Sequence, residues 1–126
     1  MGMVITTVAA KKKILLARAG IQALPKISQM AFGDGGISVE GEVLEPAETQ
    51  ENLKHEILRK DIDGYEIISD TEIQYQCTLA ENELNGSRLS EIALIDEEGE
   101  VLAIKNFSVK EKDAEWEMTF RIKDTM

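Results

Sequence analysis

The stretch LSEIALIDEEGEVLAIKNF, residues 89–107, contains two apolar runs joined by an acidic turn. Leu, Ile, Val and Phe fill both runs, residues 89–95 and 101–107, and the connection between them carries Gly99. Such runs on either side of a short glycine-containing connection predict a β-hairpin. The first run is apolar at nearly every position after Glu91, which predicts a central strand covered on both faces. We expect the rest of the chain to pack around this hairpin.

The composition is that of an ordinary globular protein. The chain has 126 residues, of which 43% are hydrophobic and 30% are charged, enough for one buried core. A formal net charge of −10 argues against a nucleic-acid-binding protein, which needs a basic surface. No run approaches the roughly 20 apolar residues of a membrane span. We therefore expect a single domain, residues 1–126, with neither a nucleic-acid nor a membrane partner.

The charges are unevenly distributed along the chain. Residues 1–39 carry five Lys or Arg and one Asp, whereas the rest of the chain is strongly acidic. A basic first segment is typical of a solvated helix face. It would also allow subunits to meet head to tail, positive against negative.

A first helix is expected close to the N-terminus. Thr6 or Thr7 is a suitable N-cap for a helix that runs to about Ala19 and stops at Gly20. Its apolar residues recur at helical spacing, interrupted only by Lys12. The other lysines and Arg18 are therefore expected to face water or a partner. The expected apolar positions are Ile5, Val8, Ala9, Leu15, Leu16 and Ala19.

A second helix is expected from Thr49 to about Lys60, with Thr49 as its N-cap. His55, the single histidine, has Glu51 one turn before it and Arg59 one turn after it. This spacing is typical of a surface histidine in a charge pair. The helix has a narrow apolar stripe, formed by Leu53, Ile57 and Leu58.

The remaining segments read as strands. Besides the hairpin, strands are expected at residues 26–32, 62–68, 71–80 and 115–123, with a charged turn at 108–114. In the last strand, Trp116, Met118, Phe120 and Ile122 are expected to share one face. The predicted fold class is α+β: an antiparallel sheet of about five or six strands with the two N-terminal-half helices packed on it.

The glycine-rich segment Gly33-Asp34-Gly35-Gly36 follows the first of these strands. Its glycines permit positive φ and predict a tight structural turn. A phosphate-binding loop is the alternative, but the segment lacks the spacing and the Lys-Ser/Thr pair of a P-loop.

No residue pattern predicts catalysis, a cofactor site or a metal site. The 24 carboxylates make pairs inevitable, and Ser87 and Ser90 lack a nucleophile elbow. His55-Glu56 lacks the second histidine of a zinc-protease helix. Cys77, the single cysteine, falls in an apolar alternation and is expected to be a small core residue. Met1-Gly2 followed by Thr6 fits the myristoylation pattern, which is short enough to match often by chance.

Four motifs in order resemble the N-terminal domain of the phage tail-collar fibre protein family. They are TTVAAKKKILLARAG (residues 6–20), MAFGDGG (30–36), TQENL (49–53) continuing through Glu56 and Arg59, and LSEIALIDEEGE (89–100). The resemblance covers nearly the whole chain, although Ala93 stands where the family tends to have a glycine. Family members usually continue into a long fibre. We therefore expect either a part of a longer fibre protein or a small tail protein made of the attachment domain alone.

The resemblance implies a structural component of a phage or prophage tail that attaches a fibre, or itself, to the baseplate or collar. It implies no catalysis, no cofactor, contact with other tail and baseplate proteins, and a homo-oligomer, often a trimer. The protein is expected in the virion tail, and in the cytoplasm of the bacterial host before assembly. The residues expected to contact partners are Lys11, Lys13 and Arg18 on the basic helix face, with Gly33, Asp34, Gly35 and Gly36.

Two other functions remain as alternatives. A small carbohydrate- or ligand-binding β-module would require an exposed aromatic platform, for which an accessible Trp116 would be the sign. A metal-dependent enzyme, using His55 and nearby carboxylates, would require a bound divalent ion.

Overall fold

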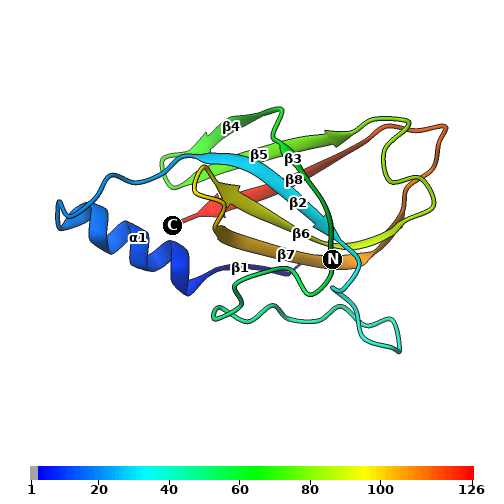
Figure 1. Cartoon of the computed structure of the whole chain (residues 1–126), viewed down its shortest axis with the longest axis horizontal. Helices are drawn as coiled ribbons and strands as arrows, with labels where there is room; N and C mark the ends of the chain where they lie inside the picture. The colour runs from blue at the N-terminus through cyan, green and yellow to red at the C-terminus, as the bar shows by residue number, and fades with distance from the viewer. Residues whose placement is uncertain (1–2) are drawn as a thin grey trace.

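The chain folds into two antiparallel β-sheets and one helix, as seen in a computed structural model that describes residues 3–126 (Figure 1). The helix is α1 (Val8–Arg18). The strands are β1 (Met3–Thr6), β2 (Ile27–Gly33), β3 (Glu56–Asp61), β4 (Gly64–Ser69), β5 (Glu72–Leu79), β6 (Arg88–Asp96), β7 (Val101–Glu111) and β8 (Met118–Thr125). The larger sheet has the order β1-β7-β6-β2-β3, and the smaller sheet has the order β4-β5-β8.

The predicted hairpin is confirmed as β6 and β7. β6 is the middle strand of the larger sheet and is buried from Leu89 to Asp96, as its apolar run predicts. Gly99 turns the chain at the hairpin tip with a φ of 85°, a conformation that glycine adopts without strain. The smaller sheet packs on the same core, where Phe32 of β2 meets Phe120 of β8 with ring centroids 5.3 Å apart.

The predicted α+β fold class is wrong, because the part of the chain that the structure describes is mostly β and contains only α1 as a helix. Residues 56–61 of the predicted second helix form β3, which pairs with β2 so that Ala31 lies opposite Arg59. The cap at Thr49 and the apolar stripe are local signals, and an isolated helix of this length is marginal in water. The free edge of β2 offers a ladder of backbone hydrogen bonds, and that non-local pairing decides the structure.

Of the last two strands, β7 is longer than predicted and β8 begins later than predicted. β7 continues through the predicted turn at residues 108–114 as far as Glu111, and β8 begins only at Met118. Phe120 and Ile122 are buried as expected. Trp116 lies before the strand and is 62% exposed, so its predicted place on the buried face is wrong.

The predicted first helix exists, but its orientation differs from the prediction. Thr7 is the N-cap, and its side-chain oxygen accepts a hydrogen bond from the backbone N–H of Ala10. The helix buries Ala10 and Lys13, whereas Leu15 is exposed. Of the expected apolar positions, Val8, Leu15 and Ala19 are exposed, Ala9 and Leu16 are partly buried, and Ile5 lies in β1. Part of the apolar stripe found in the sequence therefore points away from the protein's own sheet. β1, which precedes the helix, was not predicted.

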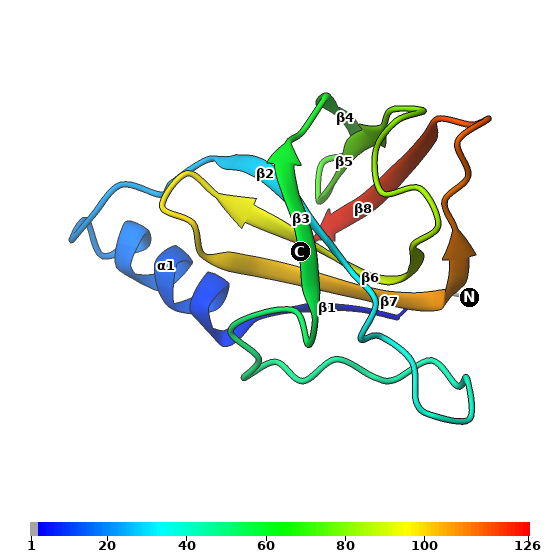
Figure 2. The same ribbon diagram turned by 45° about the vertical axis from the view of Figure 1, so that its right-hand side comes forward.

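α1 lies at one end of the larger sheet, beside the β6–β7 hairpin tip (Figure 1). The long connection between β2 and β3 runs past the β1 side of this sheet (Figure 2). Met1 and Gly2, with which the myristoylation pattern begins, lie outside the described residues. Across residues 3–126, α1 is too short and too polar to cross a bilayer.

Candidate functional site

Lys13 joins α1 to the tip of the hairpin. Its Nζ lies 2.5 Å from Oδ2 of Asp96, 2.9 Å from Oε1 of Glu98 and 2.6 Å from Oε1 of Glu100. The other carboxylate oxygen of Asp96 accepts hydrogen bonds from the backbone N–H groups of Glu98 and Glu100. Asp96 thus holds the turn with one oxygen and the helix with the other.

The charges in this cluster stabilise one another. Burial by itself would lower the pKa of Lys13, but hydrogen bonds to Asp96, Glu100 and Glu98 raise that pKa above its ordinary value. Burial by itself would raise the pKa of Asp96, but the hydrogen bond from Lys13 and those from the backbone lower it. Lys13 is only 8% exposed, so it does not face water, and its contact with a partner stays a prediction.

The other two predicted contacts on the helix are accessible. Lys11 forms an exposed ion pair with Glu48, with 2.9 Å between Nζ and Oε2. Arg18 is exposed in the last turn of α1. The structure therefore does not bring Lys11, Lys13 and Arg18 together on one accessible face.

The glycine-rich segment is built around a buried carboxylate. Oε2 of Glu91 accepts hydrogen bonds from the backbone N–H groups of Gly35 and His55, each at 2.8 Å, and Oε1 accepts one from Lys54 at 2.9 Å. The cluster of N–H groups that would suit a phosphate is thus occupied by the protein's own Glu91, which is fully buried. This arrangement favours a structural role over phosphate binding. The predicted tight turn is wrong, because Gly33 belongs to β2 and none of Gly33, Gly35 and Gly36 has a positive φ.

Close packing explains the glycines of this segment. A Cβ on Gly36 would lie 2.0 Å from the backbone oxygen of Ser90, and one on Gly33 would lie 2.4 Å from that of His55. Gly33 and Gly36 are buried, Gly35 is partly buried, and Asp34 is exposed. Only Asp34 and part of Gly35 are available to a partner.

His55 does not occupy the predicted helix. Its ring pairs with Asp34, whereas Arg59 pairs with Glu56, with 2.9 Å between Nη2 and Oε1. The predicted charge pair of His55 with Glu51 and Arg59 is therefore wrong, because residues 51–55 form an irregular segment and β3 follows it.

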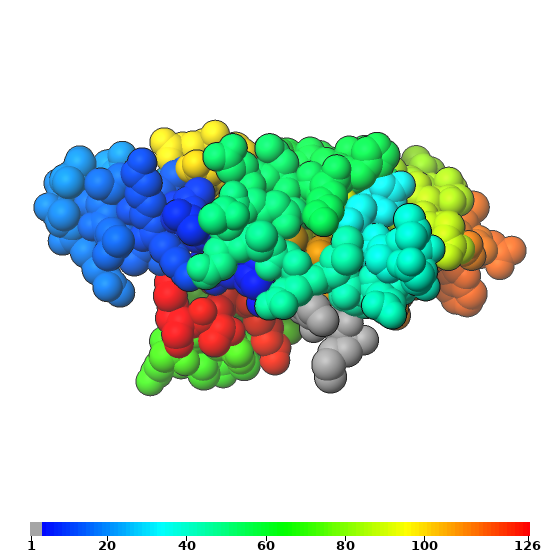
Figure 3. All heavy atoms as spheres, turned by 90° about the horizontal axis from the view of Figure 1, so that it is seen from below, coloured from blue at the N-terminus to red at the C-terminus, as the bar shows by residue number. Residues whose placement is uncertain are grey.

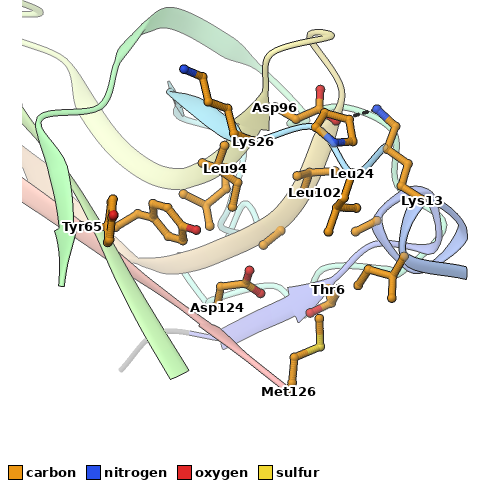
Figure 4. A pocket seen from close by; sticks show the side chains of 16 residues that line it. Thr6, Lys13, Leu24, Lys26, Tyr65, Leu94, Asp96, Leu102, Asp124 and Met126 are labelled. Atoms are coloured by element: carbon orange, nitrogen blue, oxygen red, sulfur yellow. Dashed lines mark hydrogen bonds and ion pairs between the residues drawn. The ribbon is translucent and has the colours of Figure 1, made fainter. Parts of the chain in front are cut away.

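A pocket that the sequence patterns did not predict opens where the two sheets diverge beside α1 (Figure 4). Its volume is ≈ 490 Å³, and its wall is mainly apolar. The side chain of Asp124 points into it, with Tyr65 at one end and the Lys13–Asp96 pair at the other (Figure 4). Burial raises the pKa of Asp124, and no hydrogen bond to its carboxylate is found among the described residues.

The position of Asp124 follows from strand alternation. Phe120 and Ile122 point inward from β8, so Asp124 takes the next inward position. The sequence signal available for this position was an acidic residue, Asp124, that continues the apolar alternation of Phe120 and Ile122. Whether a second layer covers that position depends on the packing of the two sheets, which no local pattern specifies.

Two further predictions concern metal and thiol chemistry. Among residues 3–126, no group of three or more His, Cys, Asp or Glu side chains is arranged to hold a metal ion. Cys77 is buried as predicted, and burial raises the pKa of its thiol to about 12, so it is protonated at neutral pH.

Comparison with known proteins identifies a family. The family described as "Phage tail-collar fibre protein, N-terminal" matches residues 1–122 of the chain. No match was found among curated proteins or among solved structures.

Proposed function

The chain belongs to the phage tail-collar fibre protein family, and we propose that it attaches a fibre, or itself, to the baseplate or collar of a tail. The family supports a structural role in a phage tail and a location in the virion tail. The attachment step, the identity of the partners and the stay in the host cytoplasm before assembly are parts of the proposal.

The observation that carries the proposal is the family match over residues 1–122, which spans nearly all of the chain. The nature of the buried charges agrees with it. Lys13, Asp96 and Glu91 are all bound to groups of the same chain, so they serve stability rather than chemistry. We propose that the protein is not an enzyme and acts through protein–protein contacts.

We propose two kinds of partner. The first is another tail or baseplate protein, for which Asp34 and Gly35 are the accessible part of the glycine-rich segment. The second is a further copy of this chain, in a homo-oligomer for which a trimer is the expected state. Lys11 and Arg18 are accessible basic residues of α1 and remain candidates for contact.

The experiment is cross-linking mass spectrometry on intact particles of the phage or prophage that encodes the chain. We expect cross-links from Lys11 or Lys54 to a tail or baseplate protein, because Lys54 is exposed next to the glycine-rich segment. Particles that lack the protein, or contain it without any such cross-link, would contradict the proposed attachment.

One observation favours a second function, a carbohydrate- or ligand-binding module. Trp116 is exposed, and an exposed aromatic ring is what sugar binding requires. Among the described residues, however, its ring stacks with no other aromatic ring, so it offers a single ring rather than a platform. Titration of Trp116 fluorescence with a panel of sugars tests this function, and saturable quenching would support it.

A further inference from the structure

The outer face of α1 combines apolar and basic side chains. Val8 and Leu15 are 47% and 62% exposed, and Lys12 and Ala19 lie on the same side at helical spacing. Arg18 borders this stripe in the last turn. A surface helix normally turns its apolar stripe toward its own core, but α1 turns Lys13 inward instead. We call Val8, Lys12, Leu15, Arg18 and Ala19 the outer helix face.

A second uncovered apolar surface lies on the inner side of the smaller sheet. Tyr65 and Ile67 of β4 are 64% and 68% exposed, although they alternate toward the side that carries the core. Cross-strand pairing places Ile67 beside Ile73, and Ile73 beside Asp124. We call Tyr65, Ile67, Ile73, Tyr75 and Asp124 the open face.

The open face remains uncovered because β4 extends past the larger sheet. In Figure 3 the segments of the smaller sheet, in green and red, project from the body of the molecule beside the blue helix. The pocket that contains Asp124 lies at the inner margin of this projection. Exposed aromatic and β-branched side chains around a half-buried carboxylate are suited to a surface of apolar groups with one cation.

We propose that the outer helix face of one copy docks on the open face of the next copy, with Arg18 or Lys12 reaching Asp124. This inference rests on the proposed self-association and identifies the surfaces that would form it. Val8 and Leu15 would lie against Tyr65 and Ile67. The carboxylate would gain a cation in a site from which water is partly excluded, where an ion pair is stronger than in water.

The choice of a second copy as the occupant follows from charge. The outer helix face carries two cations, Lys12 and Arg18, and no acid, whereas the open face carries one carboxylate, Asp124, and no cation. Two helices meeting by a two-fold axis would place like charges together. A contact between two different surfaces has no such conflict, and it closes into a ring or continues as a chain.

The test uses two variants that each disable one surface. Leu15→Glu places an acid on the outer helix face, and Ile67→Lys places a base on the open face. Both side chains are mostly exposed, so urea unfolding should remain close to that of the unaltered protein. In analytical ultracentrifugation, we expect each variant to weaken self-association by about tenfold or more. Val39→Glu is the control, since Val39 is 99% exposed and lies outside both surfaces.

Mixing the two variants gives the decisive result. Leu15→Glu keeps a functional open face and Ile67→Lys keeps a functional outer helix face, so the mixture should form a one-to-one dimer. Self-association of Ile67→Lys at the strength of the unaltered protein, or a mixture that stays monomeric, would overturn the inference. An unaltered protein that is monomeric would overturn the proposed self-association as well, whereas tail attachment is judged separately by the cross-links from particles.

Discussion

Inward-pointing carboxylates in the two sheets have opposite environments. In the larger sheet, Glu91 is bound by three backbone N–H groups, and Asp96 is bound by Lys13 and two backbone N–H groups. In the smaller sheet, Asp124 also points inward, but no described group donates a hydrogen bond to it. The two buried carboxylates of the larger sheet are therefore paired within one chain, whereas the carboxylate of Asp124 is paired with no described group.

The difference separates stability from interaction. A buried charge that is fully hydrogen-bonded positions the segments around it, and its loss lowers the unfolding free energy. A partly buried charge without a partner weakens the isolated fold and is useful only if something else binds to it. On this basis Glu91 and Asp96 belong to the scaffold, and we propose that Asp124 belongs to a surface for another molecule.

The largest effect is expected for Glu91→Ala. It leaves the N–H groups of Gly35, Lys54 and His55 without their acceptor, which should cost about 4 kcal/mol of unfolding free energy. Urea denaturation followed by circular dichroism measures the change. The matched control is Glu97→Ala, an exposed residue of the hairpin tip, which should change stability by less than about 0.5 kcal/mol. Equal effects of the two substitutions would contradict the role given to Glu91.

Lys13→Met should have the next largest effect on the unfolding free energy. It keeps the aliphatic stem but removes the cation that faces Asp96, which should cost about 3 kcal/mol. Glu98 and Glu100 are largely exposed and should contribute little to this figure. Lys12→Met is the control on the outer side of the same helix, and its unfolding free energy should match that of the unaltered protein. A loss as small as that of the control would show that the helix is held by other contacts.

A smaller effect is expected from pH. Because the pKa of Asp96 is lowered in the folded protein, its stabilisation is present above the ordinary unfolded value, near 3.9, and is lost as the pH falls through the folded value. Between pH 5 and pH 3, the unaltered protein should therefore lose about 1–2 kcal/mol more than Asp96→Asn. Urea titrations of both proteins across this range provide the measurement, and parallel curves would contradict the expectation.

The smallest effect, and one of opposite sign, is expected for Asp124→Asn. Burial disfavours the charged form of Asp124, so removing the charge should raise the unfolding free energy at pH 7 by about 0.5 kcal/mol or less. The same change should weaken self-association measured by ultracentrifugation. A destabilisation similar to that of Glu91→Ala would remove the distinction between the two sheets.

The sequence predicted the parts of the fold that depend on neighbouring residues. The apolar run of β6, the hairpin turn at Gly99 and the capped helix α1 all follow from local patterns, and all three are present. β3 was missed because its residues pair with β2, about 30 residues earlier in the chain. The local signals at this segment, a helix N-cap and an apolar stripe, predicted a helix instead.

The candidate site could be predicted only in part, for the same reason. The orientation of α1 depends on Lys13 meeting Asp96, 83 positions along the chain, and helical spacing alone favoured the opposite face. The glycine-rich segment was correctly read as structural, but its glycines serve close packing rather than a tight turn, and its acceptor, Glu91, comes from another strand. The pocket around Asp124 depends on how far one sheet extends past the other, which no sequence pattern specifies.

The pairing of β1 with β7 has a consequence for the time at which the protein folds. Met3 lies opposite Asn106, and β2 needs β6 as its neighbour, so the larger sheet joins the beginning of the chain to a segment made much later. During synthesis, β1 and β2 leave the ribosome long before the strands that cover them. Such non-local pairing makes folding slow. The exposed edges of β1 and β2 are therefore the segments that a chaperone would have to shield until the hairpin emerges.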